Sequence, residues 1–287
     1  MIDTYENFKN KLNMKALNGL DLFLDIIESI ISSPSRYAGI FRLSNAETKL
    51  LQNITQSREI KLGDFMEQIV TDYLGIVGYN NFPKSLIAGE KKNRLSADQL
   101  FANKNQLYLI EQKIRDDHDS TKKRGQFENF DKKIAYLQNE YHGCELNAAI
   151  WFIDDSLTKN KNYYLQMIEG ARKKYEDVKI TLHYGKSIFT NFIENEQIWN
   201  ELVEYLIKWK TENSKNVEVP NLDTNLDVLA AMKQLSASSL RKLLSNKKEY
   251  VLVRKELFST GANFKLLYQY FVSINDIRKN CFPIELQ

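Results

Sequence analysis

Asp98, Glu111 and Lys113 are two acids and an amine whose spacing suits a β-hairpin. The stretch 95–113 predicts two strands joined at Asn103–Asn105, because Asn tolerates the left-handed backbone angles of tight turns. The second strand begins with an apolar run, as is typical of a strand buried on both faces. Since strand side chains alternate, Glu111 and Lys113 point to one face, and a hairpin would place Asp98 alongside them. The sequence therefore predicts that these three side chains converge.

The chemistry open to such a group is that of a metal site. Burying two carboxylates together is costly unless a cation is present. Mg²⁺ prefers oxygen ligands and would relieve the repulsion, so Asp98 and Glu111 are candidate metal ligands. Lys113 could position or help to deprotonate a water molecule, or stabilise negative charge on a phosphate. The alternative is a surface hairpin whose Glu and Lys lie on its solvated face.

The order of these residues is similar to a known motif. Asp98, twelve intervening residues and then Glu111-Gln112-Lys113 resemble the PD-(D/E)XK nuclease signature, although Ala97 stands where the family usually has Pro. The resemblance implies an αβββαβ core with a mixed sheet between helices, over roughly residues 60–190. One strand of that core lacks a clear counterpart, and we expect it around Ser85–Ala88.

For function, the resemblance implies Mg²⁺-dependent hydrolysis of DNA by a metal-activated water, with Asp98 and Glu111 binding the metal and Lys113 acting on the water. A stand-alone chain of this size without a P-loop looks most like a type II restriction endonuclease, which cuts double-stranded DNA at a specific sequence. Such enzymes often act as homodimers on palindromic sites. The alternatives are a repair or junction-resolving nuclease of the same superfamily and a non-catalytic DNA-binding or assembly protein.

The helix expected before the hairpin adds one candidate. Residues 63–77 have a broad apolar face, and Glu67 borders it. In the family that the motif resembles, this helix often supplies an extra acid near the metal, so we predict Glu67 as a further site residue. The alternative is a partly solvated Glu.

A charged loop expected after the hairpin supplies cations. Lys122, Lys123 and Arg124 suit phosphate contacts, and Gln126, at the start of the next helix, could hydrogen-bond a phosphate or a water. The alternative is a solvated loop. The acidic run 116–119 lacks the spacing of an EF-hand. Lys91, Lys92 and Arg94 precede the hairpin and could meet phosphates or be solvated.

The remaining segments predict an α/β (α+β) fold with a restriction-endonuclease-like core: a central mixed sheet flanked by helices, with helical N- and C-terminal extensions. Helices are expected at 127–141, 158–174 and 193–210, and strands at 147–154 and 178–184. In the first of these helices, the apolar residues predict an inner face, which leaves four charged residues on the other side: Glu128, Asp131, Lys132 and Lys133.

Three domains are expected from these patterns. Residues 1–60 predict a helical N-terminal extension in which a second helix starts at Asn45, residues 61–210 the core, and residues 226–287 a helical region for DNA binding or dimerisation. The stretch 227–244 has the shape of a helix-turn-helix, with exposed cations at Arg241, Lys242, Lys247 and Lys248.

Composition places the chain among ordinary globular proteins. It has 287 residues and a net charge of +3, so any DNA surface must come from local clusters of charge. No apolar run approaches the ~20 residues that cross a bilayer, and no signal peptide is recognisable. Cys144 and Cys281 lack metal-ligand spacing and are expected as buried thiols. The default expectation is a cytoplasmic protein with no membrane partner.

Overall fold

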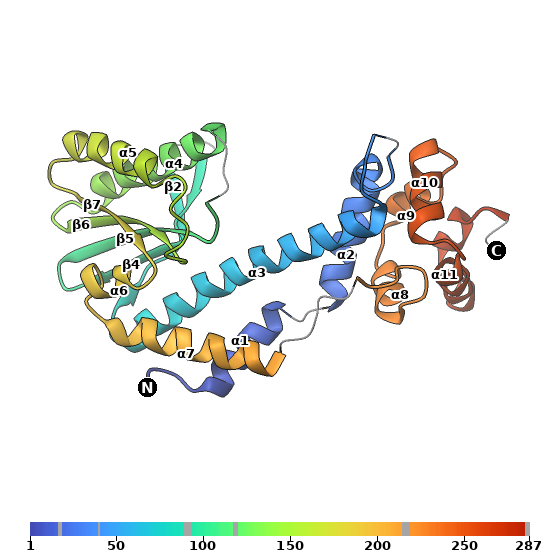
Figure 1. Ribbon diagram of the computed structural model, residues 1–287, viewed down its shortest axis with the longest axis horizontal. Coiled ribbons are helices and arrows are strands. Elements are labelled where there is room, and N and C mark those ends of the chain that lie inside the picture. Colours follow the sequence, from blue (N-terminus) through green and yellow to red (C-terminus); the bar gives the residue numbers. More distant parts are fainter. Residues whose placement is uncertain (17–18, 40, 89–92, 117–119, 214–218, 285–287) are drawn as a thin grey trace. The chain divides into compact units, whose positions relative to one another are not determined.

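The chain folds into two units, each with its own hydrophobic core. The computed structural model describes residues 1–16, 19–39, 41–88, 93–116, 120–213 and 219–284 (Figure 1). One unit, here called the sheet unit, consists of Met1–Leu12 and Leu62–Asn213. The other, the helical unit, consists of Asn13–Lys61 and Ser214–Gln287. The predicted N-terminal extension 1–60 is therefore shared between the two units, since residues 1–12 belong with the sheet.

A mixed five-stranded sheet forms the centre of the sheet unit, which confirms the predicted fold class. Its strand order is β1-β4-β5-β6-β7. β4 runs antiparallel to β1 and β5, whereas β5, β6 and β7 are parallel. The bounds are β1 Asn80–Asn81, β4 Gln99–Asn103, β5 Gln106–Lys113, β6 Glu145–Phe152 and β7 Lys179–Tyr184. β5 lies in the middle of the sheet, and its apolar run is buried, as the sequence predicted.

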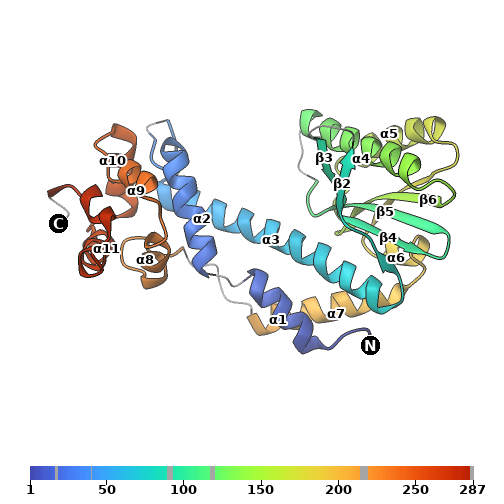
Figure 2. The ribbon, with the colours of Figure 1, turned by 180° about the vertical axis from the view of Figure 1, so that it is seen from behind.

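Helices cover both faces of this sheet (Figures 1 and 2). α4 (Ser120–Glu140) and α5 (Lys161–Lys174) pack on one face through a shared apolar cluster that includes Leu107, Leu109 and Phe130. On the other face, Trp151 of β6 makes edge contacts with aromatic rings of α6 (Ser187–Asn191) and α7 (Glu196–Asn213). Odd-numbered residues of β5 thus face α4, which decides where Glu111 and Lys113 point.

The hairpin that carries the candidate residues has a two-residue turn. Asn103 pairs with Gln106, which leaves Lys104 and Asn105 in the turn. Lys104 adopts a left-handed φ of 52°. The strand expected near residue 85 exists as β2 (Ser85–Ala88), but it pairs with β3 (Asn93–Ser96) in a separate two-stranded sheet and adds nothing to the main one.

Two helices begin elsewhere than predicted. The expected helix from Asn45 and the expected helix from Gly63 are one continuous helix, α3 (Ala46–Ile76), which contributes residues to both units. A glycine inside a helix costs only about 1 kcal/mol, so Gly63 does not interrupt it. α4 starts at Ser120 instead of Phe127, so the cations at 122–124 lie on a helix and not on a loop.

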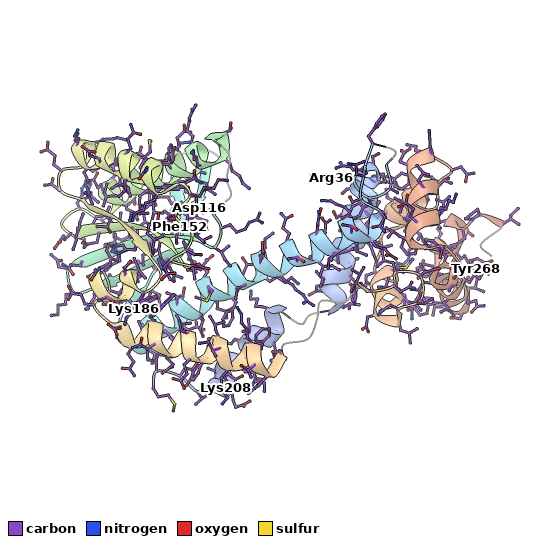
Figure 3. The ribbon with its side chains drawn as sticks, viewed as in Figure 1. Arg36, Asp116, Phe152, Lys186, Lys208 and Tyr268 are labelled. Carbon is purple, nitrogen blue, oxygen red and sulfur yellow. The ribbon has the colours of Figure 1, made fainter. Side chains whose placement is uncertain are left out.

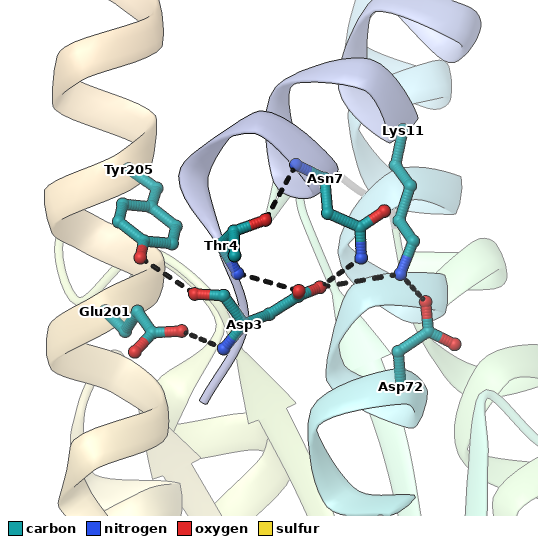
Figure 4. A network of polar contacts seen from close by, with 7 residues as sticks. All are labelled: Asp3, Thr4, Asn7, Lys11, Asp72, Glu201 and Tyr205. Carbon is teal, nitrogen blue, oxygen red and sulfur yellow. Dashed lines mark hydrogen bonds and ion pairs between the residues drawn. The ribbon is translucent and has the colours of Figure 1, made fainter. Parts of the chain in front are cut away.

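The first residues of the chain are tied into the sheet unit by a polar network (Figure 4). Glu201 of α7 accepts a hydrogen bond from the backbone N–H of Asp3 at 2.8 Å, and the Tyr205 hydroxyl donates to the Asp3 carbonyl at 2.9 Å. Lys11, on α1 (Tyr5–Ala16), pairs with Asp72 of α3 at 2.7 Å. These contacts explain why the N-terminal segment belongs with α7 and the end of α3.

The helical unit contains α2 (Gly19–Ser32), η1 (Pro34–Arg36), the start of α3, α8 (Leu226–Met232), α9 (Ala237–Leu243), α10 (Lys248–Leu257), α11 (Ala262–Ser273) and η2 (Ile277–Cys281). Its core includes Ile30, Met232 and Phe271, and Tyr268 (labelled in Figure 3) packs against it. α8 and α9 form the predicted helical pair. Its four predicted cations are exposed: Arg241, Lys242, Lys247 and Lys248.

Two observations concern the cysteines and the membrane. Cys144 is exposed and Cys281 is partly exposed, so the expectation of buried thiols was wrong. Cys144 lies in the turn between α4 and β6. None of the helices that the structure describes is long and apolar enough to span a membrane.

Candidate active site

The β4–β5 hairpin brings Asp98 and Glu111 together. Asp98 lies in the bend just before β4, and the pairing of Gln99 with Ile110 continues towards Asp98 and Glu111. The backbone N–H of Gln112 donates to Asp98 Oδ2 at 2.7 Å, which fixes the Asp98 carboxylate against β5. The two acids are thus neighbours across the end of the hairpin, as alternation along strands predicts.

Glu111 is held by two lysines. Its side chain is buried, with 7% of the residue exposed. Lys113, two residues along the same strand face, donates to Oε1 at 2.7 Å. Lys133 of α4 donates to Oε2 at 2.5 Å. Both oxygens of this buried carboxylate therefore have an ammonium partner.

Lys133 is the residue that sequence reasoning missed. We predicted it on the solvated side of the helix, but it is buried, with 5% of its surface exposed. The signal was present in the sequence, because Lys133 follows Phe130 by three residues and precedes Leu137 by four. Positions with that spacing share one helix face, and both Phe130 and Leu137 are fully buried. Helical periodicity places position 133 on the buried face of the helix, but a lysine at that position favoured its assignment to the solvated face.

The surroundings of the two acids shift their pKa values in opposite directions. Burial and the neighbouring Glu111 carboxylate raise the pKa of Asp98 to about 6, although both lysines and the Gln112 N–H oppose this. Burial alone would also raise the pKa of Glu111, but the ammonium groups of Lys113 and Lys133 outweigh it and lower that pKa. Glu111 is thus ionised at neutral pH, whereas the pKa of Asp98 stays raised although Lys113 and Lys133 are close to it.

This arrangement fits a hard divalent cation. The buried Glu111 carboxylate lies beside the partly buried Asp98 carboxylate, and the raised pKa of Asp98 indicates that an added positive charge would be favourable there. Within the part of the chain that the structure describes, no group of three or more His, Cys, Asp or Glu residues could hold a metal ion. A cation bound here would take its remaining ligands from water, backbone or substrate oxygens, as Mg²⁺ commonly does.

Glu67 lies on the neighbouring helix but has a partner of its own. Its carboxylate pairs with Lys84 at 2.7 Å, and its backbone carbonyl accepts a hydrogen bond from Gln99 at 2.7 Å. The Lys84 carbonyl in turn accepts from Ala97 N–H, one residue before Asp98. The structure therefore connects Glu67 to the segment that carries Asp98, through Lys84 and Gln99.

The predicted phosphate-binding residues lie in the first two turns of α4. Lys122 and Arg124 are exposed. Lys123 donates to Asn160 at 3.0 Å and lies over the ring of Tyr163, and Gln126 accepts from the Tyr164 hydroxyl. Two of the four side chains thus point towards α5 and two towards solvent.

The acidic run beside them is only partly described. Asp116, labelled in Figure 3, is buried and accepts hydrogen bonds from the backbone N–H and the side-chain amide of Asn160, at 2.8 and 2.7 Å. These contacts connect the end of β5 to the start of α5. The rest of the run, 117–119, and also Lys91 and Lys92, lie outside the described residues.

Comparisons with known proteins agree with this geometry. Residues 77–210 match the family model described as type II restriction endonuclease, HinfI. The type II restriction enzyme HinfI of Haemophilus influenzae is 25% identical over 217 residues, which covers 72% of this chain and 75% of that protein. No solved structure matches the chain. The matched segment contains Asp98, Glu111, Lys113 and Lys133, so the part of the chain that carries the candidate site is similar to the HinfI type II restriction endonucleases, a family that implies a PD-(D/E)XK nuclease core.

Proposed function

We propose that this protein is a type II restriction endonuclease that hydrolyses phosphodiester bonds of double-stranded DNA at a specific sequence, with Mg²⁺ as its cofactor. The observation that carries the proposal is the pair of neighbouring acids Asp98 and Glu111, with Lys113 and Lys133 beside Glu111, inside a segment that matches the HinfI family. The cytoplasm, where cellular DNA is accessible, is the proposed compartment.

Each residue has a distinct task in this proposal. Asp98 and Glu111 would hold the metal, which would supply charge to polarise a phosphate oxygen and to lower the pKa of a water molecule. Lys113 lies at the end of β5 and directs its ammonium group towards the Glu111 carboxylate. From there it can orient the water or stabilise negative charge on the phosphate. Glu67 is proposed as an auxiliary acid, supported by its connection to the Asp98 segment through Lys84.

The start of α4 supplies the proposed DNA contacts. Lys122, Lys123 and Arg124 would bind phosphates, and Gln126 a phosphate or a water. Lys123 precedes Lys133 by ten residues, which is about 15 Å along the helix. This distance corresponds to roughly four to five steps of 3.4 Å along one DNA strand. The cations would therefore contact phosphates a few nucleotides from the scissile bond, and Lys122 and Arg124 are supported best because they are exposed.

The helical unit is proposed to contribute further contacts. Residues 228–248 carry five cations and no acid, and four of those cations are exposed on or beside α9. Such a surface suits the phosphate backbone. A homodimer is proposed because a two-fold axis matches a palindromic site.

The test is cleavage of a sequenced plasmid. Purified protein with Mg²⁺ should cut at fixed positions that share one sequence, and EDTA should abolish cutting. The Asp98→Asn variant should bind the same DNA without cutting it. Degradation without fixed positions, or cutting by Asp98→Asn at the wild-type rate, would refute the proposal.

A further inference from the structure

We propose that Lys133 is a built-in counterion of the metal site, whose ammonium group competes with a divalent metal for Glu111. The inference rests on the proposed function. In this role, Lys133 stabilises the metal-free site and at the same time weakens metal binding. It is thus a positioning residue that sets how much metal the enzyme requires.

The first support is the place of Lys133 in the fold. Its Nζ atom is 2.5 Å from Glu111 Oε2, and only 6% of its side chain is exposed. The helix that carries it is anchored to the sheet by fully buried Phe130, Ile134 and Leu137. The backbone of Lys133 is therefore held beside β5, and the burial of its side chain keeps the ammonium group near Glu111. A buried lysine in a fixed helix is a permanent part of the site.

The second support is the balance of charge. Asp98 and Glu111 contribute two negative charges, and Lys113 and Lys133 contribute two positive charges. Both Glu111 oxygens already accept an ammonium hydrogen bond. A divalent metal would add two further positive charges in a site with little solvent to screen them. The metal must therefore share or displace an ammonium group at Glu111.

The two lysines differ in their freedom to respond. Lys113 lies at the end of its strand and is nearly twice as exposed as Lys133, at 11% against 6% of the side chain. It can turn towards water or a phosphate when a metal enters. Lys133, enclosed between α4 and β5, stays beside Glu111, so its repulsion acts on any bound metal.

A counterion and an ordinary structural lysine predict opposite effects of a Lys133 substitution on the affinity for metal. If Lys133 only shaped the site, removing its charge would disturb Glu111 and weaken metal binding. If it is a counterion, removing its charge tightens metal binding, while the metal-free protein becomes less stable because Glu111 loses one of its two partners.

The experiment uses the full chain and Ca²⁺ as the probe. Lys133→Gln keeps a hydrogen-bond donor without the charge, Lys133→Met removes both, and Lys132→Gln on the exposed neighbour is the matched control. Calorimetry should show Ca²⁺ binding about tenfold tighter in the two Lys133 variants and unchanged in the control. In EDTA, the urea midpoint of both Lys133 variants should be lower than that of wild type.

Each other outcome is decisive. A Lys133 variant that is unfolded in EDTA and folds with Ca²⁺ supports the inference. Equal or weaker Ca²⁺ binding in a folded variant overturns it, as does failure of both variants to fold at saturating Ca²⁺. If the single substitution Asp98→Asn leaves Ca²⁺ binding unchanged, the proposed function is refuted instead, because the metal would then lie elsewhere.

Discussion

Replacing Asp98 by Asn should stabilise the metal-free protein at neutral pH. The pKa of Asp98 is raised to about 6 from an ordinary value of 3.8, first by burial and then by Glu111. The folded state therefore binds the proton more tightly than the unfolded state does. The contribution of Asp98 to stability therefore falls as pH rises from about 4 to 6, and this loss is complete above that range. Full ionisation would cost about 3 kcal/mol, because each pH unit of difference corresponds to about 1.4 kcal/mol.

Asparagine removes this cost with little change of shape. Its amide oxygen can still accept the hydrogen bond from the Gln112 N–H. The new NH₂ group must find a partner in the site, so we expect a gain of about 1–3 kcal/mol in the free energy of unfolding at pH 7.5. At pH 3.5, where Asp98 is mostly protonated in both states, the gain should largely vanish.

Tryptophan fluorescence is a suitable assay in urea with EDTA. All three tryptophans, Trp151, Trp199 and Trp209, belong to the sheet unit, so the signal reports the unit that contains Asp98. An Asp98→Asn variant that is no more stable than wild type at pH 7.5 would contradict the reasoning. An equal gain at both pH values would contradict it too, because the effect must follow the titration of Asp98.

Glu111→Gln should lower the free energy of unfolding in the same assay, whereas Asp98→Asn should raise it. Although burial opposes ionisation, Lys113 and Lys133 lower the pKa of Glu111, so this carboxylate stabilises the fold at neutral pH. Its removal leaves the ammonium groups of buried Lys133 and partly buried Lys113 without their partner, at a cost of about 3–5 kcal/mol. A stable Glu111→Gln protein would show that the lysines do not depend on this carboxylate.

Three further predictions follow from the proposed function. Lys113→Ala and Lys113→Arg should each lose about a hundred- to ten-thousand-fold in single-turnover cleavage, while DNA binding in Ca²⁺ changes far less; near-wild-type cleavage by the Ala variant would remove Lys113 from the site. Replacing Lys122 and Arg124 by Gln should make the salt dependence of DNA binding shallower by about one unit per lost contact, without changing the cleavage sequence. Ca²⁺ binding measured by calorimetry should weaken below about pH 6, because the proton and the metal compete for Asp98; affinity constant down to pH 4.5 would exclude Asp98 as a ligand.

Much of the fold could be predicted from local patterns. The apolar run before Glu111 predicts a buried central strand, and the alternation of side chains puts Glu111 and Lys113 on one face. The turn at Asn103–Asn105 predicts the hairpin. These inferences hold because each depends on short-range geometry: the two-residue period of a strand and the backbone angles of a turn.

Other features were decided by packing between distant segments. β2 was expected as a strand of the main sheet, yet it pairs with β3 and buries Leu86 in the cluster shared with α4. Hydrophobic pattern alone does not specify the pairing partner of a strand. Similarly, α3 continues through Gly63, because one unfavourable residue costs too little to end a long helix.

The sequence by itself predicted the residues of the candidate site: an acid before the hairpin and an acid and a lysine at the end of its second strand, in a segment that resembles PD-(D/E)XK nucleases. Only the tertiary structure decided the electrostatic environment of that site. Lys133 comes from a helix 22 residues further along the chain, and its ammonium group reaches Glu111 because α4 packs on the odd-numbered face of β5. Charges so far apart in sequence interact strongly only when folding buries them together and excludes the water that would screen them.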